Sequence, residues 1–340
     1  MNSQIKNINS DLPTLFSKNT RWNSFVSTMN LQPWRIFYFG LVPKKIRKKV
    51  ALKADIELQK QMAKASKNFL NLYLNGSLEK FNLKAKKTLN TNKIIWQYWG
   101  QGVDDKTLPE TVKICFNSVD KYKKDYQIIR LDDTTIHEYL DLPEFIFEKR
   151  LNKEFKHVFF SDLLRLALLD TYGGIWMDAT ILLTNPIPEN VANMNFFVFQ
   201  RDENALDKAY FETYDPLYFG WHNSHYVNIL SSFMVGKRKN EVIHTWLDLL
   251  LNFWKTQTSI KHYFFFQIIF HELIHHKDFE KKNCTVKDDT LVHLLQTKMH
   301  EIYDAEEFAQ IQQRTSIHKL RYVKNTVPGS YYDHVKKIYL

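Results

Sequence analysis

The sequence has little cysteine and no long apolar run, and both shortages limit what the protein can be. Its 340 residues include two cysteines, Cys115 and Cys284, whose positions fit neither a metal-binding motif nor a disulfide framework. Such sparse cysteine is typical of a reducing compartment. The longest apolar runs cover residues 36–42 and 263–270, far short of the roughly 20 residues that a spanning helix needs. We therefore expect a protein that is soluble or bound to a membrane surface.

The beginning of the chain also lacks the pattern of a leader. Residues 1–6 lead into further polar residues, whereas a secretory signal peptide contains a continuous apolar region. We therefore expect no leader and a cytoplasmic location. If the protein binds a membrane, we expect it at the inner face of the cell membrane.

The composition is that of a globular protein with a high content of aromatic rings. Hydrophobic residues make up 44% of the chain and charged residues 25%, which is ordinary for a folded domain. Aromatic residues reach 15%, which indicates either a bulky core or surfaces that stack on rings. The length is enough for one large domain and an appendage.

Positive charge is concentrated in the first part of the chain. The net charge is +10, yet residues 1–90 hold 17 Lys and Arg against 4 Asp and Glu, while residues 91–340 hold 30 against 33. A basic appendage on a nearly neutral body indicates an anionic partner. Nucleic acid and anionic lipid are the two candidates.

The basic region also shows the spacing of a helix. Apolar residues recur at every fourth position, at Ile46, Val50, Ala54, Leu58 and Met62. This spacing predicts a helix, and Gly76 is suited to end it. An aromatic segment, residues 34–41, precedes a cluster of lysines and arginines. Two interpretations stay open: the segment binds an anionic bilayer, or the apolar stripe packs on the main domain and the lysines lie in solvent.

From residue 93 onwards, predicted strands and helices alternate. The expected strands cover residues 94–99, 126–131, 175–178 and 196–200. The expected helices cover residues 109–119, 134–140 and 161–171, the last capped by Ser161 and ended by Gly173 and Gly174. This order predicts an α/β protein with a mostly parallel sheet and helices on both faces. Ligands of such sheets bind at the carboxyl ends of the strands.

Three charged residues suggest where that ligand binds. Asp162 and Arg165 are three positions apart on a predicted helix, so they share one face. A carboxylate accepts hydrogen bonds from sugar hydroxyls, and a guanidinium donates to phosphate oxygens. Asp178 follows an apolar strand, where a metal or ribose ligand is expected. Each feature alone fits a helical ion pair or a turn, but their joint occurrence favours a binding site.

These residues belong to a segment that resembles a known family. The runs SDLLR at residues 161–165, YGGIWMDAT at residues 172–180 and IWQYWG at residues 95–100 are similar to motifs of the DXD-containing glycosyltransferases. That family includes capsular polysaccharide synthesis proteins, yeast initiation-specific mannosyltransferases and, more distantly, clostridial glucosylating toxins. The resemblance covers roughly residues 91–330. It implies a GT-A (nucleotide-diphospho-sugar transferase, Rossmann-like) domain over residues 91–340, preceded by a basic helical appendage, residues 1–90.

The resemblance also implies an activity. The expected reaction is the transfer of a hexose, with retention of configuration, from a nucleotide-diphosphate sugar (a UDP-sugar by family) to an acceptor. The acceptor would be a saccharide or a lipid-linked oligosaccharide in the synthesis of capsular or other bacterial cell-surface polysaccharide. An anionic membrane surface is an expected partner of residues 1–90, and nucleic acid is not expected.

Carried over to this sequence, the family motif gives roles to individual residues. Trp99 would stack on the base of the donor. Asp162 and Arg165 would hold the donor sugar and phosphate, and Asp178 would lie near the ribose and a metal ion. Ser330 would belong to a loop that closes over the diphosphate.

One position departs from the family motif. Thr180 stands where the family has the second carboxylate of its DXD sequence. Mn²⁺ and Mg²⁺ prefer carboxylate oxygens, so the resemblance implies a metal bound at Asp178 and Thr180 but leaves dependence on it open. Weaker similarities at residues 231–236, 263–266 and 318–320, together with Asp202, are interpreted as structural.

Two other classes of protein compete with this interpretation. His271, Glu272 and His275 have the spacing of a zinc metalloprotease, but the chain contains 13 histidines, so a short match arises easily by chance. A nucleic-acid-binding or membrane-binding protein without catalysis would explain the basic residues 1–90. That region contains no recognisable nucleic-acid motif.

Overall fold

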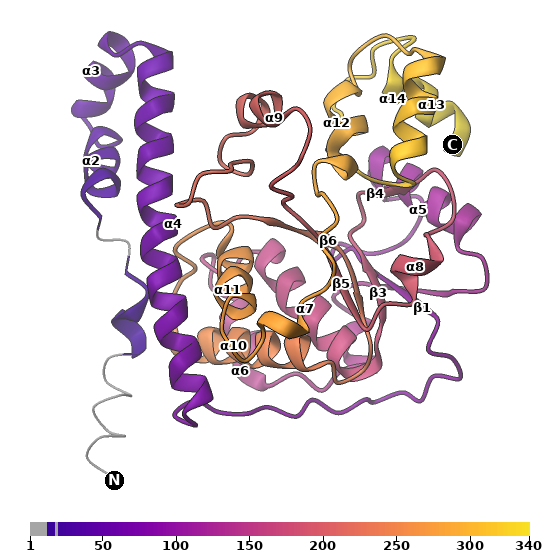
Figure 1. Cartoon of the computed structure of the whole chain (residues 1–340), viewed down its shortest axis with the longest axis horizontal. Coiled ribbons are helices and arrows are strands. Elements are labelled where there is room, and N and C mark those ends of the chain that lie inside the picture. Colours follow the sequence, from indigo (N-terminus) through magenta and orange to yellow (C-terminus); the bar gives the residue numbers. More distant parts are fainter. Residues whose placement is uncertain (1–11, 18–19) are drawn as a thin grey trace.

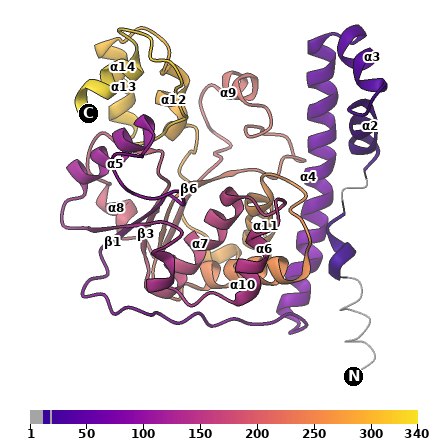
Figure 2. The same cartoon turned by 180° about the vertical axis from the view of Figure 1, so that it is seen from behind.

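The computed structural model describes residues 12–17 and 20–340. Figures 1 and 2 show an α/β body with the long helix α4 (Lys44–Leu74) standing along one side. Helices α2 (Arg21–Met29) and α3 (Trp34–Leu41) lie beside its N-terminal half, and the C-terminal helices form the opposite side. Within the described ranges, no helix combines the length and apolar character needed to cross a bilayer. The expectation of a missing leader concerns the first residues, 1–11, which lie outside those ranges.

The body contains seven strands in its described residues. They are β1 (Ile94–Tyr98), β2 (Gln127–Leu131), β3 (Gly174–Met177), β4 (Ile181–Leu183), β5 (Phe196–Gln200), β6 (Ile229–Gly236) and β7 (Ile317–Lys319). The four strands predicted from the sequence are confirmed as β1, β2, β3 and β5, with ends that differ by at most one residue. Strands β4, β6 and β7 were not predicted.

Helices surround these strands. The longer helices of the body are α5 (Glu110–Tyr122), α7 (His157–Tyr172), α10 (Glu241–Thr256), α11 (Phe265–Ile274), α13 (Ala305–Arg314) and α14 (Tyr331–Tyr339). The shorter ones are α6 (Glu144–Arg150), α8 (Glu189–Ala192), α9 (Lys208–Tyr214), α12 (Leu294–Lys298) and the 3₁₀ turns η1 (Ile136–Glu138), η2 (Glu280–Lys282) and η3 (Leu291–His293). The predicted helix at residues 109–119 is α5, and that at residues 134–140 is reduced to η1.

The central sheet mixes parallel and antiparallel pairs. Its order is β2-β1-β3-β6-β5. β1 pairs in parallel with β2 and β3, whereas β6 pairs antiparallel with both β3 and β5. Four of the five strands therefore run in one direction and β6 runs against them, so the prediction of a mostly parallel sheet is confirmed except at β6. Strands that are buried on both faces read as continuous apolar runs, and such runs do not reveal strand direction. The architecture is a mixed α/β sheet compatible with a Rossmann-like fold.

Both faces of the sheet are covered, because alternate residues of each strand enter different cores. On β1, Trp96 packs into the core that α7, α10 and α11 form, whereas Ile95 packs into the core on the other face. Trp176 and Ile175 divide in the same way on β3. This alternation follows from the two-residue period of a strand. One of these helices, α7, carries Asp162 and Arg165 of the candidate site described below.

Helix α7 begins earlier than its sequence suggests. It starts at His157, so Ser161 lies inside the helix and does not cap it. The prediction failed because the four residues before Ser161 continue the helix and bury Phe159 and Phe160 in the core, and such burial outweighs a cap. The predicted end is confirmed: Gly173 follows the helix with a φ of 77°, a conformation that glycine adopts without strain.

Helix α4 confirms the predicted stripe but divides it between two environments. Leu58 and Met62 are buried in the largest core, with Phe69 further along. Phe16 enters the same core and contacts the ring of Phe69 edge-on, with centroids 5.4 Å apart. Ile46, at the start of the stripe, is exposed. The core therefore extends into the basic region, while a domain boundary at residue 90 stays a prediction.

Candidate functional site

A polar cavity of about 360 Å³ opens beyond the carboxyl end of β3. Three predicted residues line it together: Asp162, Arg165 and Asp178. Its wall also includes Asp215, Tyr218, Phe219, Ser231, Ser232, Tyr263, Gln267, His293, Gln296, Lys319 and Arg321. The position agrees with the rule that α/β sheets bind ligands at the carboxyl ends of their strands.

Arg165 joins two of the carboxylates of the cavity, Asp162 and Asp178. Its Nη1 donates to Asp162 Oδ1 at 2.7 Å, and its Nη2 donates to Asp178 Oδ1 at 3.2 Å. The first contact is local, because Asp162 and Arg165 are one turn apart on α7. The second links helix α7 to the end of strand β3. A buried guanidinium with two carboxylate partners is held rigidly and presents positive charge to the cavity.

Asp178 is held by its neighbours immediately after β3. Its backbone N–H donates to the carbonyl of Ser232 at 2.8 Å, which extends the β3–β6 pairing by one residue. The indole N–H of Trp176 donates to Asp178 Oδ1 at 2.8 Å. The carboxylate is therefore fixed at the cavity wall through Oδ1, while its second oxygen, Oδ2, meets another group.

The group that meets Asp178 Oδ2 is Lys319, which the two-stranded sheet of β4 and β7 brings to the site. β4 and β7 pair antiparallel, with Ile181 opposite Lys319. The Lys319 ammonium lies 3.5 Å from Asp178 Oδ2 and donates to Thr180 Oγ1 at 2.5 Å. Both residues that the sequence assigned to a metal ion thus contact one lysine. The segment around Lys319 was interpreted as structural, and only the pairing of β4 with β7 shows its place at the site.

Trp99 lies next to the same turn. Its half-buried ring packs against a small buried cluster that includes Ala179, the residue between Asp178 and Thr180, and its centroid is 6.1 Å from that of Tyr322. Tyr322 is half exposed. Two rings thus stand beside the charged turn, although neither is among the residues that line the cavity. Trp96, by contrast, is fully buried and donates its indole N–H to the Gly173 carbonyl at 2.8 Å, so it belongs to the core.

Burial and charge shift the pKa values of Asp162 and Asp178 in opposite directions. Burial raises the pKa of Asp162 to about 7, against the attraction of Arg165. Burial also acts to raise the pKa of Asp178, but the positive charges of Arg165 and Lys319 outweigh it and lower that pKa below its usual value. Asp178 is therefore ionised at neutral pH, while Asp162 exchanges a proton near neutrality.

A buried ion pair supports the far wall of the cavity. Arg201 Nε and Nη2 donate to the two carboxylate oxygens of Asp289 at 2.8 and 3.0 Å. Tyr218 donates its hydroxyl to Asp289 Oδ2 at 3.1 Å. His293 lies beside them, and burial lowers its pKa to about 4, so it is neutral at pH 7. This network holds aromatic and neutral groups opposite the charged wall.

Other residues that the sequence brought forward lie elsewhere. Ser330 is buried at the start of α14, where its hydroxyl accepts from the Asp333 N–H as a helix cap. Asp202 follows β5, and its carboxylate accepts from the Asn204 N–H in a local turn. Neither residue is among those that line the cavity.

The zinc-protease spacing falls on α11 and at its end. His275 Nδ1 lies 2.7 Å from the His271 carbonyl, and burial lowers the pKa of His271 to about 3. His271 Nδ1 lies 3.0 Å from the Asn228 amide. Among residues 12–17 and 20–340, no group of three or more His, Cys, Asp or Glu side chains is arranged to hold a metal ion. The spacing thus lacks a third ligand in the described chain.

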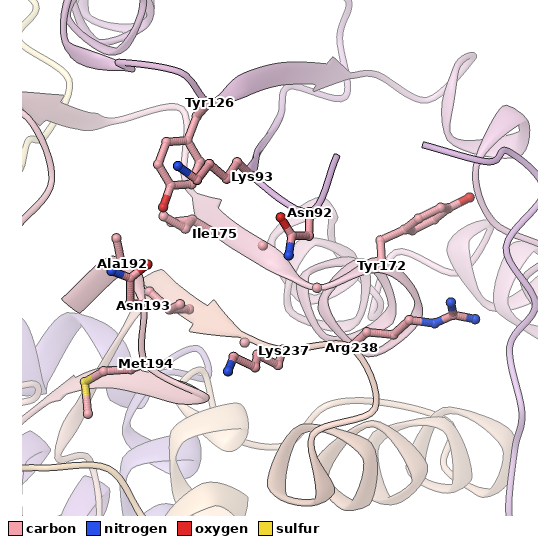
Figure 3. A pocket seen from close by; sticks show the side chains of 14 residues that line it. Asn92, Lys93, Tyr126, Tyr172, Ile175, Ala192, Asn193, Met194, Lys237 and Arg238 are labelled. Carbon is pink, nitrogen blue, oxygen red and sulfur yellow. The ribbon is translucent and has the colours of Figure 1, made fainter. Parts of the chain in front are cut away.

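A second cavity, of about 580 Å³, opens at the other end of the central strands, where β1 and β3 begin. Figure 3 shows Lys93, Lys237 and Arg238 around it, together with Tyr126 and Tyr172. Its lining contains no Asp or Glu. It also lies where β3 begins rather than where it ends, so it does not share the geometry of the candidate site.

The fold and the cavity define a class: a mixed α/β protein with a charged polar site at the carboxyl end of a central strand. Comparison with known proteins gives the family. Residues 46–335 match the family described as capsular polysaccharide synthesis protein, and the chain belongs to that family. It is also similar to the O-glycosyltransferase braB of Annulohypoxylon truncatum, with 23% identity over 197 residues. That match covers 53% of this chain and 42% of the fungal protein.

Proposed function

We propose that the protein is a glycosyltransferase of GT-A type, which moves a hexose from a nucleotide-diphosphate sugar to a saccharide acceptor. The observation that carries the proposal is the convergence of Asp162, Arg165, Asp178 and Lys319 on one cavity. Two carboxylates can accept from sugar and ribose hydroxyls, and two cations can bind a diphosphate. Membership of the capsular family and the similarity to a named O-glycosyltransferase support the same activity.

The geometry suggests how the donor would lie. The base, uridine by the resemblance, would stack on Trp99 beside Tyr322, at the edge of the Asp178 turn. The diphosphate would extend past Lys319 and Arg165, and the hexose would reach Asp162 deeper in the cavity. The acceptor would enter from the side of Asp215 and Arg321, whose ion pair of 2.7 Å lies towards solvent.

Retention of configuration would follow from reaction on one face of the sugar. In that step the acceptor oxygen bonds to the anomeric carbon while the bond from that carbon to the diphosphate oxygen breaks. The acceptor proton passes to the departing diphosphate, so the products are the glycoside and the nucleoside diphosphate. Arg165 and Lys319 would stabilise the negative charge that develops on the leaving group, and electrostatic terms of this kind dominate such reactions.

The residues present do not fit the divalent metal that the family resemblance implies. Of the two groups that would bind it, one is a hydroxyl, and the Lys319 ammonium already contacts both. A hard divalent cation needs several oxygen ligands, and carboxylates are the preferred ones. We therefore propose that Lys319, in place of a metal ion, supplies the positive charge at the diphosphate.

Release of nucleoside diphosphate tests the activity. Purified protein is incubated with a panel of nucleotide sugars, and donor binding is measured in parallel by calorimetry. We expect one donor to bind and to hydrolyse slowly, and Asp178→Asn to lower the rate by about 10³-fold with an unchanged melting temperature. Asp125→Asn, on an exposed carboxylate paired with Lys93, is the control and should retain full activity. A chain that neither binds nor hydrolyses any donor is not a transferase of this type.

The role of Lys319 is tested separately. We expect wild-type turnover to be unchanged by EDTA, and Lys319→Ala to lower kcat by about 10²- to 10³-fold. Adding Thr180→Asp to Lys319→Ala restores the usual carboxylate pair, and activity should then return with Mn²⁺. If EDTA instead abolishes wild-type turnover and Mn²⁺ restores it, the metal hypothesis stands and the role of Lys319 is wrong, while the transfer activity is unaffected.

A further inference from the structure

Helices α2 and α3 contain no buried residue. They stand beside the N-terminal half of α4, away from the body (Figure 1). We call residues 21–49, which comprise α2, α3 and the first turns of α4, the tip. The large apolar side chains exposed on the tip are Phe25, Leu31, Trp34, Ile36, Phe37, Phe39, Leu41 and Ile46. Leu41 is 77% exposed, and Ile36 is 66% exposed. So many large apolar groups in one exposed segment mark an interaction surface.

The aromatic helix α3 of the tip has little stability of its own in water. An isolated helix shorter than about 12–15 residues is marginal in water, and α3 has eight residues with the sequence WRIFYFGL. Tyr38 meets Phe25 and Phe39 at centroid distances of 6.2 and 5.7 Å, which shapes the tip without covering it. The outward rings therefore need a partner to gain the free energy of burial.

Charge indicates the chemistry of that partner. Residues 12–54 contain nine Lys and Arg and no Asp or Glu. Five of these cations lie in the first turns of α4, directly after the aromatic helix α3. Arg47 lies over the ring of Phe39 at 4.5 Å, so cations and rings share one surface. Aromatic residues beside a continuous set of lysines and arginines are suited to the headgroup region of an anionic bilayer.

The C-terminal half of α4 fixes the tip in space. Met62 and Phe69 are fully buried, and α4 packs against α10 and α11. The tip is thereby held at the end of the molecule where α9 and α12 lie, as both views show. The cavity is lined from this end by Asp215, directly after α9, and by Gln296 of α12. A surface that the tip touches would therefore lie at the end of the molecule from which Asp215 and Gln296 reach the cavity.

We propose that the tip docks the protein on an anionic phospholipid bilayer, with α3 in the interface and the lysines of α4 at the headgroups. Two copies of the tip would repel each other, since each carries positive charge without an acidic counterpart. Nucleic acid would satisfy the charge but would leave the outward rings of α3 in water. Docking is independent of the proposed activity, although it would place a lipid-linked acceptor near the cavity.

Vesicle sedimentation with the full-length chain tests the proposal. The probes are vesicles of phosphatidylcholine alone and vesicles in which a third of the lipid is phosphatidylglycerol. We expect sedimentation only with the anionic vesicles at physiological salt. Phe37→Ser should weaken partitioning by about tenfold, and Lys45→Glu by more than about fivefold, since each basic group near the surface contributes about that factor. Because these side chains are exposed, the variants should keep the wild-type melting temperature.

Matched variants on the body control for general hydrophobic and charge effects. Leu151 is 88% exposed at the end of α6, and Lys153 is exposed beside it. Leu151→Ser and Lys153→Glu should leave partitioning unchanged. Quenching of tryptophan fluorescence by brominated acyl chains tests whether Trp34 enters the bilayer. Trp34→Phe should still bind the vesicles, but the quenching that comes from Trp34 should be lost.

Three results would overturn the proposal. The first is an absence of sedimentation with anionic vesicles, or sedimentation that the tip and body variants change equally. The second is a dimer in analytical ultracentrifugation that Phe37→Ser dissociates, which would make a second copy the partner. The third is that the wild-type protein does not sediment with the vesicles but binds duplex DNA, and that Lys45→Glu abolishes this DNA binding. Donor hydrolysis measured without lipid stays the same in each case, so failure of docking is distinct from failure of the proposed activity.

Discussion

At the scale of single residues, Asp162 and Asp178 contact the same guanidinium but have pKa values shifted in opposite directions. Both contact Arg165, yet burial raises the pKa of Asp162 to about 7, while Lys319 and Arg165 together lower the pKa of Asp178. The difference arises because Asp178 has two cations near it and Asp162 has one. Of the two carboxylates that contact Arg165, Asp178 therefore stays ionised at neutral pH, whereas the charge of Asp162 depends on pH.

This difference predicts a pH dependence of activity. If ionised Asp162 accepts a hydroxyl of the donor sugar, kcat/KM should rise with pH and level off above about 7. Asp162→Asn should lower kcat/KM and remove this inflection. A pH profile of donor hydrolysis for both proteins measures the effect. An unchanged inflection in Asp162→Asn would show that another group titrates.

The same pKa shift affects stability with a defined sign. Between the pKa of an unfolded aspartate and about 7, the native state binds more protons at Asp162 than the unfolded state does. The contribution of this group to the free energy of unfolding therefore falls as pH rises through that range. Asp162→Asn should flatten this fall in urea unfolding measured at several pH values, provided that the variant remains folded.

At the scale of elements, the junction of α7 and β3 sets the spacing between Arg165 and Asp178. Gly173 turns the chain with a φ of 77°, and Gly174 follows with a φ of 106°. A Cβ at Gly173 would lie 2.8 Å from the backbone N of Arg238, and one at Gly174 would lie 2.6 Å from the carbonyl oxygen of Ile94. The two glycines thus allow the chain to leave α7 and enter β3 close beside β1.

The junction gives a matched pair of variants. Gly173→Ala should lower the free energy of unfolding by about 2–4 kcal/mol, because it adds a backbone clash to an unfavourable φ. Gly76→Ala, at a φ of 80° with nothing within 4 Å of the added Cβ, should cost only about 1–2 kcal/mol. Urea unfolding of both variants measures the difference. Equal losses would show that the close approach at Gly173 is unimportant.

The pairing of β4 with β7 is the second element that builds the site. Leu182 lies opposite His318, and Leu320 N–H donates to the Thr180 carbonyl at 2.9 Å. His318 is fully buried beside Thr184, with Nε2 3.0 Å from its hydroxyl. This pairing places Lys319 next to a turn that precedes it by about 140 residues.

At the scale of the whole molecule, α4 is both a core helix and the support of an exposed tip. Its C-terminal half shares the largest core with α10, α11 and the segment around Phe16. Its N-terminal half has no residue buried before Ala54. One helix thus joins a surface proposed to bind lipid to the domain that holds the cavity.

This division predicts unequal effects along one helix. Phe69→Ala removes a fully buried ring and should lower the free energy of unfolding by about 3–5 kcal/mol. Ile46→Ala, at a side chain that is 51% exposed, should change it by less than about 0.5 kcal/mol. Thermal and urea unfolding measure both. A large loss in Ile46→Ala would mean that the tip packs on the body in solution.

The sequence by itself determined the local parts of this protein. The strands β1, β2, β3 and β5 follow from short apolar runs, whereas the course of α4 and the shared face of Asp162 and Arg165 follow from spacing of three to four residues. Such spacing reflects which side chains a single element buries, and it is read within a short window. The family motif added the expectation that Asp178 joins this pair, and the structure brings the three residues to one cavity.

Only the tertiary structure decided which elements meet. The antiparallel entry of β6, the arrival of Lys319 beside Thr180, the structural place of Ser330 and the exposed half of α4 depend on pairing between distant segments. An apolar strand carries no mark of its direction, and a lysine carries no mark of its partner. These choices follow from the free energy of packing the whole chain, to which contacts far apart in sequence contribute together.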